Sequence, residues 1–133
     1  MLRGFTTISY WAADHDAARR WYTDLLGVEP YFNMPGYCEF RIGDYQHELG
    51  IVDSAYAPPG TAVAGAGVVT YWHVDDVAGA LETLLAKGAT LHDQIRERGS
   101  GFVTASVVDP FGNLLGVMYN PHYLEVLAAR SAG

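Results

Sequence analysis

The chain contains an internal repeat, and this repeat limits the possible folds more than any other feature of the sequence. Residues 9–27 read SYWAADHDAARRWYTDLLG, and residues 70–88 read TYWHVDDVAGALETLLAKG. At a constant offset of 61 positions the two segments share a Tyr-Trp dipeptide, an aspartate (Asp14 and Asp75) and a final glycine. A repeat of this kind predicts two copies of one supersecondary unit.

Each copy begins with a predicted strand and a predicted helix. The segments 5–12 and 68–74 are rich in β-branched and aromatic residues, which indicates strands. The two aspartates are suitable helix N-caps, and Gly27 and Gly88 stand where a helix ends in a left-handed residue. The apolar positions with helical spacing are Ala18, Trp21, Tyr22 and Leu25 in the first copy, and Val77, Leu81, Leu84 and Leu85 in the second.

Each predicted helix is followed by a short strand and a hairpin. In the first copy a strand precedes a turn at Gly43-Asp44, and a further strand covers 48–52. In the second copy strands at 102–108 and 114–119 are joined by Asp109-Pro110-Phe111-Gly112-Asn113, whose proline and glycine suit a tight turn. In the strand before the first turn, Cys38, Phe40 and Ile42 alternate with Tyr37, Glu39 and Arg41. The predicted fold class is α+β, with two βαβββ modules in tandem.

The modules are expected to form one domain over 1–133. Their predicted bounds are about 4–53 and 67–120, and a linker covers 53–67, which holds two consecutive prolines and three glycines. The segment from 121 to 133 is a C-terminal tail. Its part up to Arg130 predicts a short helix with Leu124, Leu127 and Ala128 on one face.

Charge and cysteine content exclude several classes of partner. The net charge of −7 disfavours nucleic acid and anionic membranes, and it is compatible with a cationic ligand. Cys38 is the single cysteine, so neither an internal disulfide nor a cysteine zinc cluster can form, and we expect a reducing, cytoplasmic compartment. The sequence has no uninterrupted apolar run near the ~18 residues of a membrane helix and no cleavable leader.

Two motifs and the repeat carry a resemblance to a known superfamily. The motifs are WYTDLLG at 21–27, at the end of the first helix, and DPFGN at 109–113, in the last hairpin. With the duplicated βαβββ order, they resemble the vicinal oxygen chelate proteins, which include glyoxalase I, extradiol dioxygenases and bleomycin-resistance proteins. The resemblance implies a curved, cup-shaped mixed sheet around a ligand cavity, with the helices on the outer face.

The resemblance also implies where a divalent metal would bind. Enzymes of this superfamily use histidine on the first strand of each half and glutamate on the last strand of one or both halves. The corresponding positions of this chain are Thr7, Val69, Gly116 and either Gly50 or Glu48. Because Val69 and Gly116 carry no donor atom in their side chains, we expect no metal cofactor. A displaced divalent-metal site built from Glu48, His73 and His122 is the alternative.

Strand alternation predicts a ligand-binding face. If Thr7 and Val69 face the cavity, a period of two places Ser9, Trp11, Tyr71 and His73 on the same face. A placement wrong by one residue would exchange them for Tyr10 and Trp72. Trp11 and Tyr71 could equally be ordinary core residues. The predicted ligand-binding residues are Thr7, Ser9, Trp11, Glu48, Val69, Tyr71, His73, Gly116 and Met118.

The remaining histidines are expected to be structural or solvated. His15, in the first turn of a helix, and His92, near the start of a strand, are predicted to be exposed. His47, next to Glu48, is expected in a solvated turn. His122 belongs to an Asn-Pro-His-Tyr segment that resembles a tail motif of metal-free members of the superfamily.

Three function classes are compatible with these residues. The favoured one is binding of an aromatic or cationic small organic ligand without a metal, as in the bleomycin-resistance proteins. The second is a metal-free enzyme that uses His73 or Glu48 for proton transfer, since imidazole and carboxylate act as general acids and bases. The third is a metal-dependent lyase, isomerase or extradiol-type dioxygenase. Exposed sheet edges in the predicted modules favour a homodimer.

Overall fold

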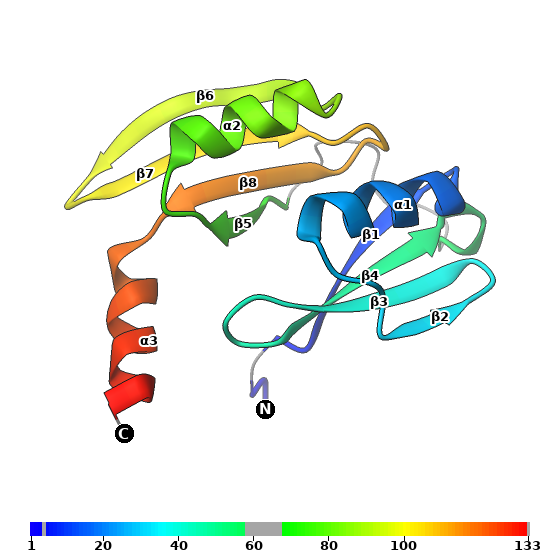
Figure 1. The fold of residues 1–133 in the computed structure, drawn as a ribbon, viewed down its shortest axis with the longest axis horizontal. Helices are drawn as coiled ribbons and strands as arrows, with labels where there is room; N and C mark the ends of the chain where they lie inside the picture. Colours follow the sequence, from blue (N-terminus) through cyan, green and yellow to red (C-terminus); the bar gives the residue numbers. More distant parts are fainter. Residues whose placement is uncertain (4, 58–67, 133) are drawn as a thin grey trace. The chain divides into compact units, whose positions relative to one another are not determined.

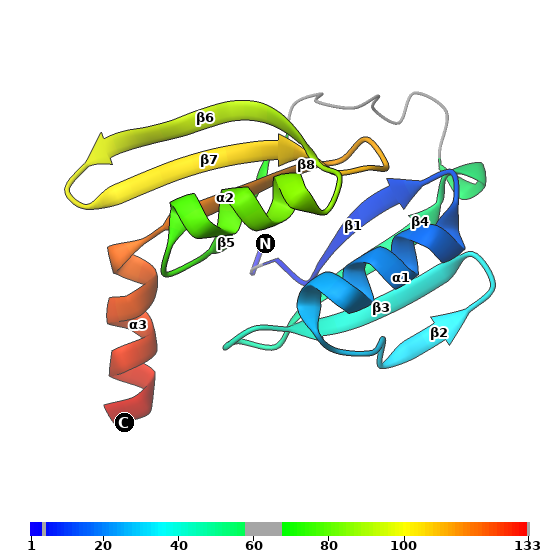
Figure 2. The ribbon, with the colours of Figure 1, turned by 45° about the horizontal axis from the view of Figure 1, so that its top comes forward.

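The computed structural model describes residues 1–3, 5–57 and 68–132 (Figure 1). The chain divides into two compact units, residues 1–61 and 62–133, and each is described by itself. In both units one helix packs on one face of a four-stranded sheet (Figures 1 and 2). Among the described residues, every helix is too short or too polar to span a membrane.

The first unit has the strand order β1-β4-β3-β2. β1 runs parallel to β4, and the other neighbours are antiparallel, so the sheet is mixed. Its elements are β1 (Thr7–Ala12), α1 (His15–Leu26), β2 (Phe32–Met34), β3 (Tyr37–Ile42), β4 (His47–Asp53) and a short 3₁₀ turn, η1 (Ser54–Tyr56).

The second unit repeats this arrangement with the order β5-β8-β7-β6. β5 is parallel to β8, and the other pairs are antiparallel. Its elements are β5 (Thr70–His73), α2 (Val77–Ala86), β6 (Thr90–Gly99), β7 (Phe102–Val108), β8 (Leu114–Tyr119) and a C-terminal helix, α3 (Pro121–Ala132). The predicted α+β class, the tandem βαβββ modules and the helical tail are confirmed.

Local signals set the bounds of α1. The Asp14 carboxylate accepts a hydrogen bond from the backbone N–H of Ala17 at 3.0 Å, which satisfies a donor that the first turn leaves without a partner. Gly27 has a φ of 71° and donates its N–H to the Thr23 carbonyl, so glycine ends the helix without steric cost. Tyr22 is buried and its ring lies 5.8 Å from that of Tyr10. This contact turns Tyr10 toward α1.

Alternation along the strands then divides each sheet into a face covered by its helix and a face without one, which we call the open face. In the first unit Tyr10 and Ala12 are buried on the α1 side, so Thr7, Ser9 and Trp11 lie on the open face. The predicted alternation of β3 holds as well, because Cys38 and Phe40 are buried.

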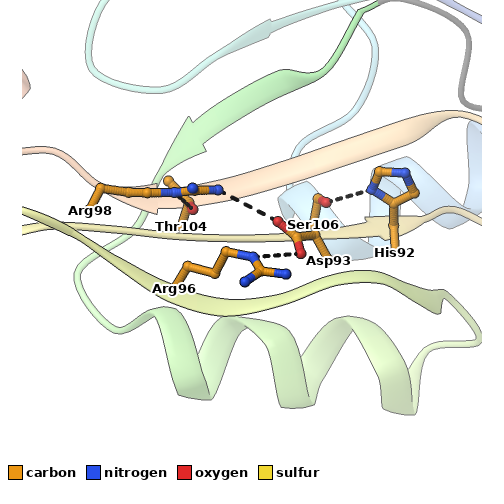
Figure 3. Close-up of polar contacts among 6 residues, drawn as sticks. All are labelled: His92, Asp93, Arg96, Arg98, Thr104 and Ser106. Atoms are coloured by element: carbon orange, nitrogen blue, oxygen red, sulfur yellow. Dashed lines mark hydrogen bonds and ion pairs between the residues drawn. The ribbon is translucent and has the colours of Figure 1, made fainter.

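In the second unit α2 packs against β7 and β8. Figure 3 shows Thr104 and Ser106 on the side of the sheet away from α2, so Ala105 and Val107, which alternate with them, face the helix. Directly paired residues share a face. Because Ser106 pairs with Gly116, which in turn pairs with Tyr71, the side chain of Tyr71 belongs to the open face.

Two repeat correspondences predicted from the offset of 61 are wrong by one residue. The N-cap of α2 is Asp76, whose carboxylate accepts from the Gly79 N–H at 3.1 Å, whereas Asp75 contacts His73. β5 is shifted in the same way, because Tyr71 pairs with Gly116 as Ser9 pairs with Gly50, so strand and N-cap are both offset by 62 and the helical segment up to Gly88 is one residue shorter. As a result Tyr10 corresponds to Trp72 rather than Tyr71, and Trp11 to His73 rather than Trp72.

Other local expectations also need correction. His15 is not exposed: it is 7% accessible, and its Nε2 lies 3.0 Å from the Ile51 carbonyl oxygen, which ties α1 to β4. His47 and Glu48 belong to β4 rather than to a turn. Leu85, expected on the buried face of α2, is exposed. β6 is ten residues long, not short.

Several expectations of the sequence hold or fall outside the described part of the chain. The strands at 102–108 and 114–119 have the predicted bounds, and Gly88 has the left-handed conformation expected after a helix, with a φ of 100°. Of the predicted linker, residues 58–67 lie outside the described residues, and its beginning forms the end of β4 and η1.

Asp109 organises the hairpin between β7 and β8. Its buried carboxylate accepts from the backbone N–H groups of Phe111 at 2.9 Å and Asn113 at 2.8 Å, and also from the side-chain amide of Asn113. Gly112 supplies the positive φ of the turn, 95°. The motif Asp-Pro-Phe-Gly-Asn is thus a self-contained hydrogen-bonded turn.

We predict that Asp109→Ala lowers the free energy of unfolding by about 2 kcal/mol, because the half-buried N–H donors of Phe111 and Asn113 lose their acceptor. Asp109→Asn keeps one acceptor oxygen, so the loss should be smaller. Denaturant unfolding of both variants measures the difference, with Glu82→Ala on exposed α2 surface as the control. Equal losses for the Ala and Asn variants would contradict this role.

Candidate functional site

The open face of the first unit brings two predicted site residues together. The Thr7 hydroxyl donates to the Glu48 carboxylate at 3.0 Å, and the two residues are directly paired between β1 and β4. Glu48 is also paired with Arg41 on β3. Ser9 lies in the next row of the same face, paired with Gly50. The structure therefore gathers Thr7, Ser9 and Glu48 on one surface.

A carboxylate with two phenol donors lies beside them. Tyr31 and Tyr37 each donate a short hydrogen bond from their hydroxyl to a different oxygen of Glu39. The Arg41 guanidinium stands over the ring of Tyr31, with its central carbon 4.2 Å from the ring centroid. Glu39 pairs with Gly50, so this cluster borders the row of Ser9.

These contacts shift the pKa values of Glu39, Tyr31 and Tyr37 from their ordinary values. Hydrogen bonds from Tyr31 and then Tyr37 lower the pKa of Glu39 below its ordinary value. Burial and then the hydrogen bond to Glu39 raise the pKa of Tyr37 well above its ordinary value, and the hydrogen bond to Glu39 raises that of Tyr31. At neutral pH the cluster is therefore one anionic acceptor held by two neutral phenols.

Aromatic side chains occupy the space beside Gly116 and Gly50, the two glycines among the positions that the resemblance assigns to metal ligands, with Glu48 as the alternative to Gly50. A Cβ built on Gly116 would stand 2.5 Å from Cδ1 of Tyr71 and 2.7 Å from its Cε1, so the ring lies directly against the glycine backbone. A Cβ on Gly50 would meet the Tyr37 hydroxyl at 3.1 Å and the Ser9 hydroxyl at 3.4 Å. Side chains larger than hydrogen would disturb both places.

His73 is held through both ring nitrogens. Nδ1 accepts a hydrogen bond from the Asn120 N–H at 3.1 Å, and Nε2 lies 3.2 Å from an oxygen of Asp75, so Nε2 is the protonated nitrogen of the neutral ring. Tyr123 stacks on the imidazole with a centroid distance of 4.6 Å and an angle of 7°. This histidine anchors the start of α3 to the end of β5.

A second polar cluster lies on β6 and β7 (Figure 3). The Arg96 Nε donates to Asp93 at 2.8 Å, the Arg98 Nε donates to the Thr104 hydroxyl at 3.0 Å, and an Arg98 Nη lies 3.6 Å from Asp93. The His92 Nδ1 is 2.9 Å from the Ser106 hydroxyl oxygen. A bulge in the β6–β7 pairing next to Asp93 lets His92 reach Ser106.

The donors present do not fit the metal centre that the resemblance implies. Thr7 is bonded to Glu48, and Gly50 and Gly116 have no ligand atom in their side chains. Within residues 1–3, 5–57 and 68–132, no three His, Cys, Asp or Glu side chains are grouped to hold an ion. In the displaced alternative, His73 already uses both nitrogens, and His122 is exposed and faces Glu125 at 3.9 Å.

The first unit contains two further features, a buried thiol and a surface groove. Burial raises the pKa of the Cys38 thiol to about 11, so it is a protonated core residue at neutral pH. A groove of about 850 Å³ lies beside the start of α1 and the β2–β3 hairpin. Three of its polar groups serve the fold, because Asp14 and Asp53 cap helices and His15 bonds the Ile51 carbonyl, and Asp16 and Arg19 pair with each other.

The other predicted site residues are distributed as follows. Trp11 is half-buried on the open face of β1, and Met118 lies beside His73 in the pairing of β8 with β5. Tyr71 is 42% exposed. Val69 is half-buried and precedes β5 rather than belonging to it.

Several open-face residues were not among the predicted site residues. They are Tyr31, Tyr37, Glu39 and Arg41 in the first unit, and Asp93, Arg96, Arg98, Thr104 and Ser106 in the second. The alternation of Tyr37, Glu39 and Arg41 with buried residues was the available signal for the first group. For the second group the alternation could not be recognised in the sequence, because β6 is longer than expected and contains bulges.

Comparison with known proteins assigns the chain's family and supports its fold. The sequence profile of the Glyoxalase/Bleomycin resistance protein/Dioxygenase superfamily matches residues 4–117. Among curated proteins there is no significant match.

Solved structures with a similar fold have low sequence identity. A glyoxalase-related enzyme from Fulvimarina pelagi aligns with a TM-score of 0.72 and 23% identity, covering 90% of each chain. A lactoylglutathione lyase from Agrobacterium tumefaciens has a TM-score of 0.65 and 22% identity, covering 90% of this chain and 95% of its own. A glyoxalase/bleomycin resistance protein/dioxygenase family enzyme from Burkholderia phytofirmans PsJN has 0.70 and 18%, covering 86% and 96%. At these identities the likeness concerns the fold alone.

We predict that Glu39→Gln lowers the pKa of Tyr31 toward the ordinary value and that of Tyr37 part of the way, because burial is the larger cause for Tyr37. Tyrosine ¹³Cζ shifts followed by NMR from pH 8 upward measure both groups. Glu29→Gln, in an exposed loop, is the matched control. Unchanged titration of both phenols in Glu39→Gln would contradict the cluster.

The sign of the linked stability follows from these directions. The lowered pKa of Glu39 contributes stability above the ordinary glutamate value, and this contribution is lost as the pH falls through the lowered value. The raised pKa values of Tyr31 and Tyr37 contribute stability below about pH 10, which is lost as the pH rises through the raised values.

Proposed function

Because the chain belongs to the Glyoxalase/Bleomycin resistance protein/Dioxygenase superfamily, we propose that it binds a small organic ligand on the open faces of its sheets without a metal ion. One observation carries this proposal: the Tyr71 ring lies against Gly116, at a position where family enzymes carry a glutamate ligand. In this chain an aromatic ring, and no donor atom from position 116, lies at that place. Such an arrangement favours contact with a flat apolar molecule over coordination of a cation.

Exposed aromatic groups support an aromatic ligand. Tyr71 on the second open face and Phe32, which pairs with Glu39 on the first, are both exposed, so their rings are available to stack on an aromatic ligand. A purely cationic ligand is the weaker alternative, although Glu39 and Glu48 would attract one. Arg41 already supplies a cation to the Tyr31 ring, so that ring face is occupied by the protein itself.

The metal-free enzyme is the second candidate, and the contacts of its proposed groups disfavour it. His73 would have to break its bond with Asn120 or Asp75 to exchange a proton with a substrate. Glu48 accepts from Thr7, but it keeps a second oxygen available for proton transfer. Glu48 is therefore the better candidate of the two for any proton-transfer role.

The proposal includes a homodimer in a reducing, cytoplasmic compartment. β2 and β6 are edge strands of their sheets, and edge strands in natural proteins are commonly covered by another chain or element. Cys38 is the single cysteine and is a free, buried thiol, so the chain has no internal disulfide that would need an oxidising compartment.

We predict that tag-free protein from its own host carries a small organic molecule and less than about 0.1 equivalent of divalent metal, because one carboxylate holds a cation only weakly. Native mass spectrometry and elemental analysis test both statements on one sample. About one equivalent of Fe, Mn, Ni or Zn that disappears in Glu48→Gln or His73→Ala would overturn the metal-free proposal.

We predict that Trp11→Ala weakens binding of the recovered molecule by roughly 1 to 3 kcal/mol, since a stacking surface on the open face is lost. Trp11→Phe retains an aromatic ring and should lose less. Calorimetric titration measures affinity, and thermal unfolding measures stability. Trp72→Ala, a residue on the α2 side of β5, is the control. Unchanged affinity with a large loss of stability in Trp11→Ala would identify Trp11 as core.

A further inference from the structure

Two arginines converge on one carboxylate on the open face of the second unit. Arg96 and Arg98 both come from β6, and their guanidinium groups approach different oxygens of Asp93, at 2.8 Å and 3.6 Å (Figure 3). The three formal charges sum to +1. This local excess is unusual for the chain, which has a net charge of −7 and only eight lysines and arginines.

The arginines retain donors that the fold does not use. A guanidinium has five N–H groups arranged in a planar fork. Among the described residues, Arg96 binds Asp93 through Nε, and Arg98 uses Nε for Thr104 and one Nη for Asp93. Both Nη groups of Arg96 and one of Arg98 therefore have no partner there. The two side chains are 47% and 48% exposed, so these donors can be reached from solvent.

Asp93 and Thr104 hold the guanidinium groups in place. Without such contacts, exposed arginine side chains would lose considerable rotamer entropy on binding a ligand. Here the Nε of each arginine is already bonded on the protein side. The remaining forks are thus preorganised for a planar anion, and carboxylate oxygens match their spacing in a bidentate pair.

The same face offers an aromatic surface at a defined separation. Tyr71, Gly116, Ser106 and Asp93 form one row across β5, β8, β7 and β6. Neighbouring strands lie about 4.8 Å apart, so two strands and about 14 Å separate the backbones at the ends of the row. Gly116 and Ser106, both with small side chains, lie between Tyr71 and Asp93 in this row, and Arg96 lies in the next row of the same face, opposite Thr104.

We propose that the open face of the second unit binds a flat aromatic carboxylic acid, with its carboxylate on Arg96 and Arg98 and its ring on the side of Tyr71. This inference rests on the proposed function and adds the sign of the ligand's charge. The alternative is that Arg96, Asp93 and Arg98 form a solvated ion pair that only supports the strand. Exposed ion pairs contribute little stability, so binding measurements distinguish the two better than unfolding does.

The test compares two probes that differ in charge and share their shape, trans-cinnamate and trans-cinnamamide, by calorimetry and ¹⁵N-HSQC titration. We expect cinnamate to bind at least about tenfold more tightly than cinnamamide, and its shift changes to map to β6, β7 and β8. Arg96→Gln/Arg98→Gln should weaken cinnamate by at least about tenfold and leave cinnamamide unchanged.

Three further variants separate the contributions. Arg20→Gln/Arg130→Gln removes the same charge from exposed positions of α1 and α3, and should change cinnamate affinity by less than about twofold, because neither arginine belongs to the Asp93 cluster. Arg96→Lys/Arg98→Lys retains charge without the planar fork and should give an intermediate affinity. Tyr71→Leu should weaken both probes by about threefold to tenfold. Thermal unfolding confirms that each variant is folded.

Failure of this inference can be distinguished from failure of the proposed function. Equal binding of the two probes, or cinnamate affinity that the Arg96→Gln/Arg98→Gln variant does not change, would overturn the anionic-ligand inference. Absence of binding by both probes would overturn it as well. If native mass spectrometry still recovers an organic molecule in either case, the proposed ligand-binding function stands without the aromatic acid.

Discussion

A single helix covers one face of each four-stranded sheet, and the rest of the structure depends on this constraint. The contact of Tyr10 with Tyr22 fixes which residues of β1 point toward α1. With a side-chain period of two and fixed strand register, that choice determines the orientation of every residue in the sheet. Cys38 and Phe40 become core, whereas Glu39 and Arg41 are directed to the open face.

The open faces have no helix to bury them, so their composition reflects other requirements. Both modules place a glycine on the strand next to the first one, Gly50 in β4 and Gly116 in β8, and both have a tyrosine beside it. A duplicated fold that retained metal ligands would need carboxylates there. The glycines allow an aromatic ring to approach the backbone, and this explains why small residues lie in the middle of strands that otherwise favour large ones.

The repeat and the turn residues predicted the fold well because they act locally. Gly27 ends α1, and the Asp109 turn joins β7 and β8 as expected, since each depends on backbone conformation and neighbouring hydrogen bonds. The offset of 61 failed at the α2 N-cap because Asp75 and Asp76 are both suitable caps. In the structure Asp76 caps the helix by accepting from the Gly79 N–H, while Asp75 contacts His73 instead.

The candidate site was predictable only in part. Strand alternation predicted that Thr7, Ser9 and Tyr71 lie on the open faces, because alternation follows from strand geometry alone. Strand alternation does not predict which side chains form hydrogen bonds with one another. Two tyrosines from β3 and the segment before β2 meet on Glu39, and a bulge in β6 brings His92 to Ser106. Such side-chain contacts depend on rotamers and on irregularities in strand pairing, and a single sequence specifies neither.

The charges of the two open faces differ in sign, although the modules share one architecture. The first carries Glu39 and Glu48 with one arginine, and the second carries Arg96 and Arg98 with one aspartate. Because salt screens charges within about 8 to 10 Å, a bound ligand senses these groups far more than the net charge of −7. The total charge that suggested a cationic ligand therefore says little about either face. The charge of the ligand is decided by whichever local cluster keeps donors or acceptors that the protein does not already use.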